Sequence, residues 1–255
     1  MKTHVVLAHP EPKSFNGQLA TMTCQTMEAE GPVTVSDLYA MGFDPCEGPQ
    51  HYLDRHDPAV FHTQSEQRAS ADRGAIPDDV SSEAQRLLYC DLLVVHFPLW
   101  WFGPPAILKG WMDRVFVYGH MYRSAMRYDH GICAGKRMIA CVTTGASADS
   151  CALDGREGDT LMHLWPILFP FRYLGFEVYT PQVFHGVGGV AFIEGQEDGL
   201  STLDAYARRW TGTLSTLSSR SLVPYNPETD FDEDTKRLLP DAPSYSPFIR
   251  HGPQE

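Results

Sequence analysis

The sequence predicts an α/β fold in which a parallel sheet is covered by helices on both faces. Five apolar runs of strand length occur along the 255 residues, and a stretch with helical spacing follows each of them. Hydrophobic residues make up 43% of the chain and charged residues 20%, which is enough to build a sizeable core. This alternation is typical of βα units, so we expect one large domain.

The first two strands are predicted at residues 2–8 and 33–35. A polar turn follows the first strand, and Ser14 can cap the helix that begins there. Residues 46–79 are polar and marked by Gly and Pro, which is long for a structureless connection and typical of a functional or interface loop. A short helix leads from this stretch to the third strand.

The remaining elements continue the same alternation of strand and helix. The third strand, over residues 91–97, is almost wholly apolar, as expected for a strand buried on both faces. In chain order, the others are a helix over 107–115, a strand over 137–143, a helix over 160–173, a strand over 177–184 and a helix from about 197 to 217.

From residue 218 the composition shifts to Pro, Asp and Ser. Such a segment cannot bury enough apolar surface to offset the entropy of ordering it, yet it carries apolar residues that are costly to leave in water. These are Leu238, Leu239, Tyr245, Phe248 and Ile249. Two interpretations stay open: the segment packs against a partner subunit, or it is a frayed terminus.

Charge and spacing patterns exclude several classes of function. The formal net charge of −12 argues against nucleic-acid or anionic-membrane binding and favours a small-molecule or protein partner. The N-terminal apolar stretch is too short for a signal peptide, so we expect a cytoplasmic protein. The six cysteines form no CxxC pair and the histidines no HxxxH spacing, so we expect no metal site. His96, inside an apolar strand, is expected to be a core histidine.

Ligands of open parallel sheets bind at the carboxyl ends of the strands, where three predicted loops meet. The loop over residues 9–16 contains neither GxGxxG nor GxxxxGK[ST], so the usual dinucleotide fingerprint and the P-loop are absent. A phosphate can still bind at the helix N-terminus, with His9, Ser14 and Asn16 as additional donors. The alternative is that Ser14 only caps the helix.

Aromatic side chains mark the second loop. Leu99 is followed by Trp100, Trp101 and Phe102 outside a strand end, and a flat conjugated ligand would explain them. The alternative is that a tryptophan packs beneath the following helix, and we expect one of the two to do so. The third loop begins with Thr143, Thr144 and Gly145, small residues that let a ring system approach the backbone, although a simple tight turn explains them equally well.

Several stretches between residues 5 and 184 share a pattern with a known family. They are residues 7–9 with 14–16, 36–41, 97–99 with 101–103, 105–111 continuing to 114–116, 143–145, and 158–159 with 164–167. Together they resemble the NAD(P)H:quinone oxidoreductase (DT-diaphorase) family of flavodoxin-like flavoproteins. The resemblance implies a doubly wound, five-stranded parallel sheet of order 2-1-3-4-5, with residues 1–217 as the catalytic domain and residues 218–255 as a Pro-rich extension.

The resemblance also implies a homodimer with two sites at the subunit interface, FAD as the cofactor with FMN as the alternative, and NAD(P)H as co-substrate. The expected cofactor-binding residues are His9, Ser14, Phe15, Asn16, Pro98, Leu99, Trp100, Trp101, Phe102, Thr143, Thr144 and Gly145. The expected substrate-binding residues are Trp101, Phe102, Tyr122 and Ser124, with Tyr122 contributed by the partner subunit.

The chain departs from the family at two positions beside the expected flavin. Cys151 and Glu157 stand where the mammalian members have a tyrosine and a histidine, which makes them the candidate catalytic residues. Glu157 can pair with Arg156 or Arg127, donate a proton to a quinone, or be a solvated loop charge. Cys151 can equally be a space-filling residue. Ser124 replaces a second tyrosine, and Trp100 replaces a glutamine.

The sequence thus predicts a flavin-dependent NAD(P)H:quinone oxidoreductase that passes two electrons as hydride in a ping-pong reaction. The alternative is a regulatory flavoprotein subunit of a bacterial potassium-efflux system, since one branch of the family resembles such subunits. A one-electron carrier is disfavoured by the aromatic residues at Trp101 and Phe102.

Overall fold

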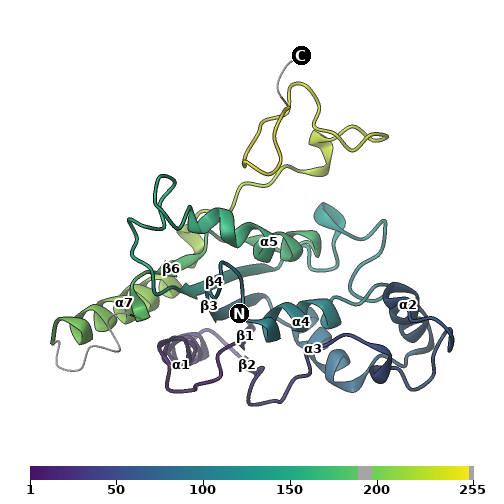
Figure 1. Ribbon diagram of the computed structural model, residues 1–255, viewed down its shortest axis with the longest axis horizontal. Coiled ribbons are helices and arrows are strands. Elements are labelled where there is room, and N and C mark those ends of the chain that lie inside the picture. Colours follow the sequence, from purple (N-terminus) through teal and green to yellow (C-terminus); the bar gives the residue numbers. More distant parts are fainter. Residues whose placement is uncertain (189–196, 253–255) are drawn as a thin grey trace.

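The computed structural model describes residues 1–188 and 197–252 and contains one parallel sheet of order β2-β1-β3-β4-β5, with β6 also paired to β4 (Figure 1). The strands are β1 (Thr3–Leu7), β2 (Val33–Asp37), β3 (Leu92–Pro98), β4 (Arg137–Thr143), β5 (Glu177–Val178) and β6 (Gln182–Phe184). The sheet order expected from the family resemblance is confirmed.

The predicted fifth strand is two short strands, because a proline interrupts it. Pro181 has no N–H to donate to the ladder, so β5 and β6 pair with β4 on either side of it. The residues just before the proline form backbone hydrogen bonds with the start of the C-terminal extension. Thr180 N donates to Ser221 O (2.9 Å), and Val223 N donates to Val178 O (2.7 Å). The start of the extension therefore covers the edge of the sheet at β5.

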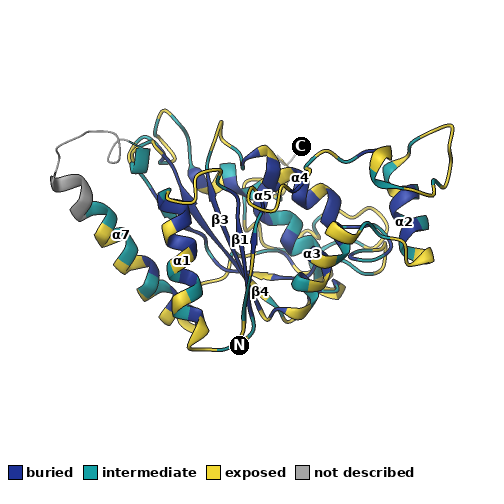
Figure 2. Cartoon of the chain, turned by 90° about the horizontal axis from the view of Figure 1, so that it is seen from below, coloured by how far each residue is buried: buried dark blue, intermediate teal, exposed yellow. Residues whose placement is uncertain are grey.

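Helices lie on both faces of the sheet. Figure 2 shows α1 and α7 on one side and α3, α4 and α5 on the other, with α2 farther out. Their bounds are α1 (Phe15–Glu28), α2 (Thr63–Arg73), α3 (Asp78–Tyr89), α4 (Ala106–Val115), α5 (Thr160–Tyr173) and α7 (Glu197–Ser215). Short 3-10 turns lie at η1 (Pro49–His51), η2 (Tyr128–His130), η3 (Leu217–Ser219) and η4 (Glu228–Asp230). No helix in these described parts is both long and apolar enough to cross a membrane.

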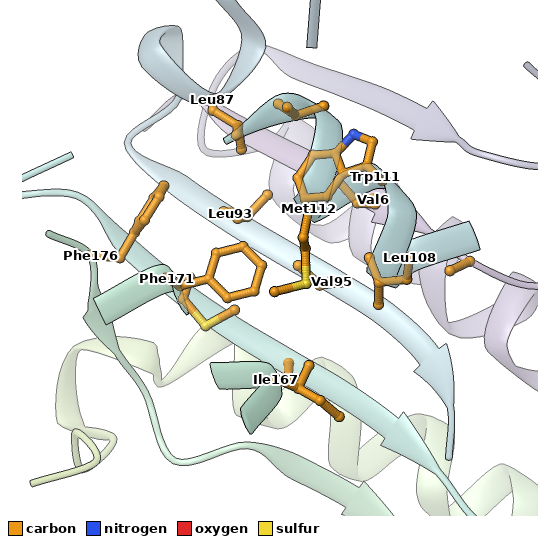
Figure 3. Packing of buried hydrophobic residues seen from close by; sticks show 14 of the residues in the cluster. Val6, Leu87, Leu93, Val95, Leu108, Trp111, Met112, Ile167, Phe171 and Phe176 are labelled. Atoms are coloured by element: carbon orange, nitrogen blue, oxygen red, sulfur yellow. The ribbon is translucent and has the colours of Figure 1, made fainter. Parts of the chain in front are cut away.

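The core has a layer on each face of the central strand β3. Leu93 and Val95 point into the layer that contains Trp111 and Phe171, as Figure 3 shows. The alternate residues of the same strand, including Leu92 and Val94, pack with Trp210 of α7 in the other layer. Both faces of β3 are thus buried and almost wholly apolar, as its sequence indicated.

The long polar stretch between β2 and α3 contains a helix that the sequence pattern did not reveal. The buried residues of α2 are Glu66, Gln67 and Ser70, so no apolar stripe marks its inner face. Glu66 accepts hydrogen bonds from Arg55 Nε (2.8 Å) and from the backbone N–H of His56 (2.7 Å). Burial alone would raise the pKa of Glu66, but these donors lower it to about 2. A buried carboxylate therefore organises this segment.

The C-terminal extension stands away from the sheet above α5 in Figure 1, where it is drawn in yellow. Phe248 stacks on Trp165 of α5, with ring centroids 5.1 Å apart and an interplanar angle of 18°. Tyr225 also packs on Trp165, at 5.3 Å. A cavity of about 2210 Å³ lies between the extension, α5 and residues 127–130. Leu239 and Tyr245 remain exposed.

Candidate functional site

The three loops expected to form the site do meet at the carboxyl ends of β1, β3 and β4. Leu99 N donates to Thr143 O (2.8 Å), and Asn16 Nδ2 donates to Thr143 Oγ1 (2.7 Å). The rings of His9 and Trp100 lie edge to face with centroids 5.8 Å apart. Residues from all three loops are therefore in direct contact.

The N-terminus of α1 suits an anion. Ser14 caps the helix by accepting a hydrogen bond from Gly17 N (3.2 Å), and no acidic residue occupies the first turn. His9 Nδ1 lies 3.0 Å from Glu11 N and 3.1 Å from Glu11 O, so the ring is held against the turn before α1. Burial lowers the pKa of His9, which favours the neutral ring.

The aromatic loop is a tight two-residue turn. Trp100 and Gly103 exchange backbone hydrogen bonds of 2.9 and 3.0 Å, and the central residues Trp101 and Phe102 have φ of 51° and 62°. Left-handed backbone costs a residue with a side chain about 1–2 kcal/mol. Such strain in a loop beside a pocket is typical of functional sites.

Neither tryptophan packs beneath helix α4, so that expectation was wrong. Trp100 is 43% exposed and Trp101 is 96% exposed. The physical reason is the turn itself, which places Trp101 at its tip and leaves Trp100 against His9. A large exposed aromatic at a strand end is costly in water, and a ligand or a second protein surface would cover it.

A pocket of about 180 Å³ opens beside this turn. Its lining comes from the second and third loops and from α5: Leu99, Trp101, Phe102, Thr144, Ala146, Cys151, Glu157 and His163. Six of these eight residues are among those the sequence singled out; Ala146 and His163 were missed. His163 lies four residues after Asp159, the N-cap of α5, and this position at the start of a helix at the carboxyl edge of the sheet is the signal that could have found it.

The two candidate catalytic residues both line the pocket. Glu157 Oε1 accepts from Arg156 Nε (3.0 Å) and Nη2 (2.8 Å), which is one of the predicted arrangements. Cys151 is buried, and its carbonyl accepts from Thr160 N (3.3 Å) at the start of α5. Their catalytic role stays a prediction.

His163 also lines the pocket and contacts the backbone of Glu157. Its Nε2 lies 2.8 Å from the backbone carbonyl oxygen of Glu157, so the nitrogen carries the proton and donates it. The imidazole packs on Phe102, with ring centroids 5.0 Å apart and an interplanar angle of 42°. The ring therefore has a fixed tautomer and a fixed position in the pocket wall.

Tyr122 and Ser124 lie outside this pocket in their own chain. Tyr122 packs between Tyr118 (5.3 Å) and Tyr173 (5.4 Å), and its hydroxyl accepts from Gln64 Nε2 (3.3 Å). Ser124 is exposed in the segment after α4. Their expected approach to the substrate from a partner subunit stays a prediction.

The residues at the site fit a ligand that joins a phosphate to a planar ring system. Asn16 Oδ1 is a buried acceptor with no hydrogen-bond partner in the described parts of the chain, so a ligand donor would satisfy it. The α1 N-terminus supplies donors for the phosphate, and the exposed face of Trp101 suits a flat ring. A flavin nucleotide has both parts.

Comparison with known proteins decides the family. Residues 1–209 match the family described by its flavodoxin-like fold. The chain is 38% identical over 185 residues to a ribosyldihydronicotinamide dehydrogenase (quinone) of Pongo abelii, covering 71% of this chain and 80% of that protein. It is 36% identical over 231 residues to NAD(P)H dehydrogenase (quinone) 1 of Rattus norvegicus, covering 89% and 81%. The chain belongs to the NAD(P)H:quinone oxidoreductase family.

Solved structures agree with this membership. A Klebsiella pneumoniae protein assigned provisionally as a quinone reductase has a TM-score of 0.84 at 29% identity, over 94% of both chains. General stress protein 14 of Treponema denticola, solved with FMN, has a TM-score of 0.59 at 24% identity over 85% of this chain and 99% of that one, which shows the shared fold. The family resemblance and the expected enzyme class, NAD(P)H dehydrogenase (quinone), are confirmed.

Proposed function

We propose that the protein is a flavin-dependent NAD(P)H:quinone oxidoreductase with FAD as its cofactor and FMN as the alternative. The observation that carries the proposal is the pairing of an anion-binding helix N-terminus with a strained aromatic turn at one edge of the sheet. The flavin, when bound, supplies the hydride chemistry between a nicotinamide and a quinone. The protein supplies binding and orientation.

Two groups of residues would hold the cofactor. His9, Ser14, Phe15 and Asn16 lie around the α1 N-terminus and would hold phosphate and ribityl groups. The ring system would lie against the other two loops. Its neighbours there would be Pro98, Leu99, Trp100, Trp101, Phe102, Thr143, Thr144 and Gly145.

Both substrates would use the one pocket beside Trp101 and Phe102. In the alternating reaction, the oxidised nucleotide would leave before the quinone enters the same place. Initial rates measured at several concentrations of both substrates should therefore give parallel double-reciprocal lines. Intersecting lines would overturn the alternating reaction, and mass analysis of the released cofactor would distinguish FAD from FMN.

The alternative, a regulatory subunit of a potassium-efflux system, makes a different prediction. The curated relatives reported above are named for dehydrogenase activity, which supports the enzyme. Slow turnover of simple quinones together with capture of a membrane antiporter would favour the regulatory function instead. In either case we expect the protein to act in the cytoplasm.

The extension supports a homodimer. Its exposed apolar residues include Tyr245 and Leu239, and Leu239 borders the cavity of about 2210 Å³ that faces α5; a second copy would cover both residues. Removing residues 219–255 should weaken dimerisation or flavin retention, measured by light scattering and by cofactor content. A truncated protein of unchanged mass and activity would contradict this assignment.

A further inference from the structure

Besides the Cys151 thiol, the pocket beside the aromatic turn contains two ionisable side chains, Glu157 and His163. They differ in how they are held. The Glu157 carboxylate accepts two N–H bonds from Arg156, both at Oε1, so this oxygen already has its partners within the loop.

His163 is held through only one of its ring nitrogens. Nε2–H donates to the Glu157 carbonyl (2.8 Å), so Nδ1 is the nitrogen that takes up or releases a proton. The ring packs on Phe102 at 5.0 Å, which positions it beside the aromatic turn proposed to contact substrate. Geometry thus gives His163 both a fixed position and an exchangeable proton.

We propose that His163 is the acid that protonates the quinone; this rests on the proposed function. Reduction of a quinone to a hydroquinone requires two electrons and two protons. Hydride, ultimately from NAD(P)H, supplies both electrons and one proton to the quinone, and the second proton passes from the His163 imidazolium to a quinone oxygen. The neutral imidazole then takes a proton from water, so the overall reaction consumes NAD(P)H, quinone and one solvent proton.

The other ionisable groups of the pocket come from the loop before α5. They are the Glu157 carboxylate, which is paired with Arg156, and the Cys151 thiol. The Asp159 carboxylate caps α5 by accepting from Leu161 N (2.8 Å). The carbonyl acceptor on Nε2 holds a proton on that ring nitrogen.

The half-reactions separate this role from a structural one. His163→Gln keeps an N–H donor for the Glu157 carbonyl but removes the acid. In rapid mixing, we expect flavin reduction by NAD(P)H to be unchanged and reoxidation by duroquinone to slow by about 10²–10⁴-fold. His56→Gln is the matched control, because His56 is exposed and lies in the segment between β2 and α2.

A second readout needs no turnover. In protein with isotopically labelled histidine, the signal absent from His163→Gln identifies the ring, and duroquinone added to the oxidised wild type should shift that signal. Loss of reoxidation in Glu157→Gln with normal reoxidation in His163→Gln would overturn the proposal and make Glu157 the acid. An unshifted signal would also overturn it. A wild type that reduces no quinone would contradict the proposed function. An active wild type with unchanged reoxidation in His163→Gln would contradict only the role of His163.

Discussion

Two buried histidines should make the fold sensitive to mild acid. His4 Nδ1 accepts from Thr34 Oγ1 (2.9 Å), and its Nε2–H donates to Ser36 Oγ (3.3 Å), whose own proton goes to Glu83. The neutral ring is therefore fully paired. Burial, with a contribution from Arg86, lowers the pKa of His4 to about 4.

His96 has a similar reason to stay neutral. Trp210 Nε1 donates to Thr23 Oγ1 (2.8 Å) and Thr23 donates to Leu19 O (2.9 Å), so His96 Nε2–H must donate to the same hydroxyl (2.9 Å). Its Nδ1 is buried with no partner in the described parts of the chain. A second ring proton would have no acceptor there, and burial lowers the pKa of His96 to about 3.

The magnitude follows from these pKa values. Both histidines titrate near 6.5 when unfolded, so below that pH the unfolded chain binds protons that the folded protein does not. Stability is full above pH 6.5 and falls as the pH drops toward the folded values. Between pH 7.5 and pH 5, each histidine should remove about 2 kcal/mol from the free energy of unfolding, about 4 kcal/mol together. That is a large part of the 5–15 kcal/mol typical of a domain.

Urea denaturation at the two pH values measures this loss. His96→Gln, which keeps a donor for Thr23, should lose about 2 kcal/mol less than the wild type over the same range. The less buried His9, His120 and His185, whose pKa values burial also lowers, contribute equally to both proteins. Carboxylates such as Glu66 contribute little in this window, because they titrate below pH 5 even when unfolded. Equal pH dependence in both proteins would refute the assignment of the loss to His96.

Two further predictions concern buried polar contacts. Trp111→Phe removes the N–H that donates to Glu83 Oε2 (2.8 Å) and should lower the free energy of unfolding by about 1.5–3 kcal/mol. The control Tyr39→Phe should lower it by at most about 0.5 kcal/mol, and urea denaturation measures both. Asn16→Ala removes the buried Oδ1 acceptor and should weaken flavin binding by about tenfold in a fluorescence titration; unchanged affinity would mean that this acceptor does not face the cofactor.

The sheet could be predicted because its strands have simple patterns. β3 is apolar at every buried position except His96, and α5 begins at the residue after Asp159, a good helix cap. The helix α2 could not be predicted in the same way. Its buried residues are polar and paired with distant backbone groups, so hydrophobic periodicity carries no signal there.

The site was predicted where it depends on contiguous loops and missed where it depends on tertiary contact. Leu99 and Phe102 follow a strand directly, so their place at the sheet edge is a local property. His163 reaches the same pocket from α5, and its partner is a backbone carbonyl that carries no sequence signature. The left-handed turn at Trp101 was missed because aromatic residues rarely adopt that conformation.

An anaerobic titration followed by the visible absorbance of the flavin tests the central claim most directly. We expect the purified protein to carry a flavin and NAD(P)H to bleach its absorbance. Duroquinone, added after the oxidised nucleotide is removed, should restore the absorbance with one quinone consumed per flavin. A protein without flavin, or a reduced flavin that duroquinone leaves bleached, would contradict the account.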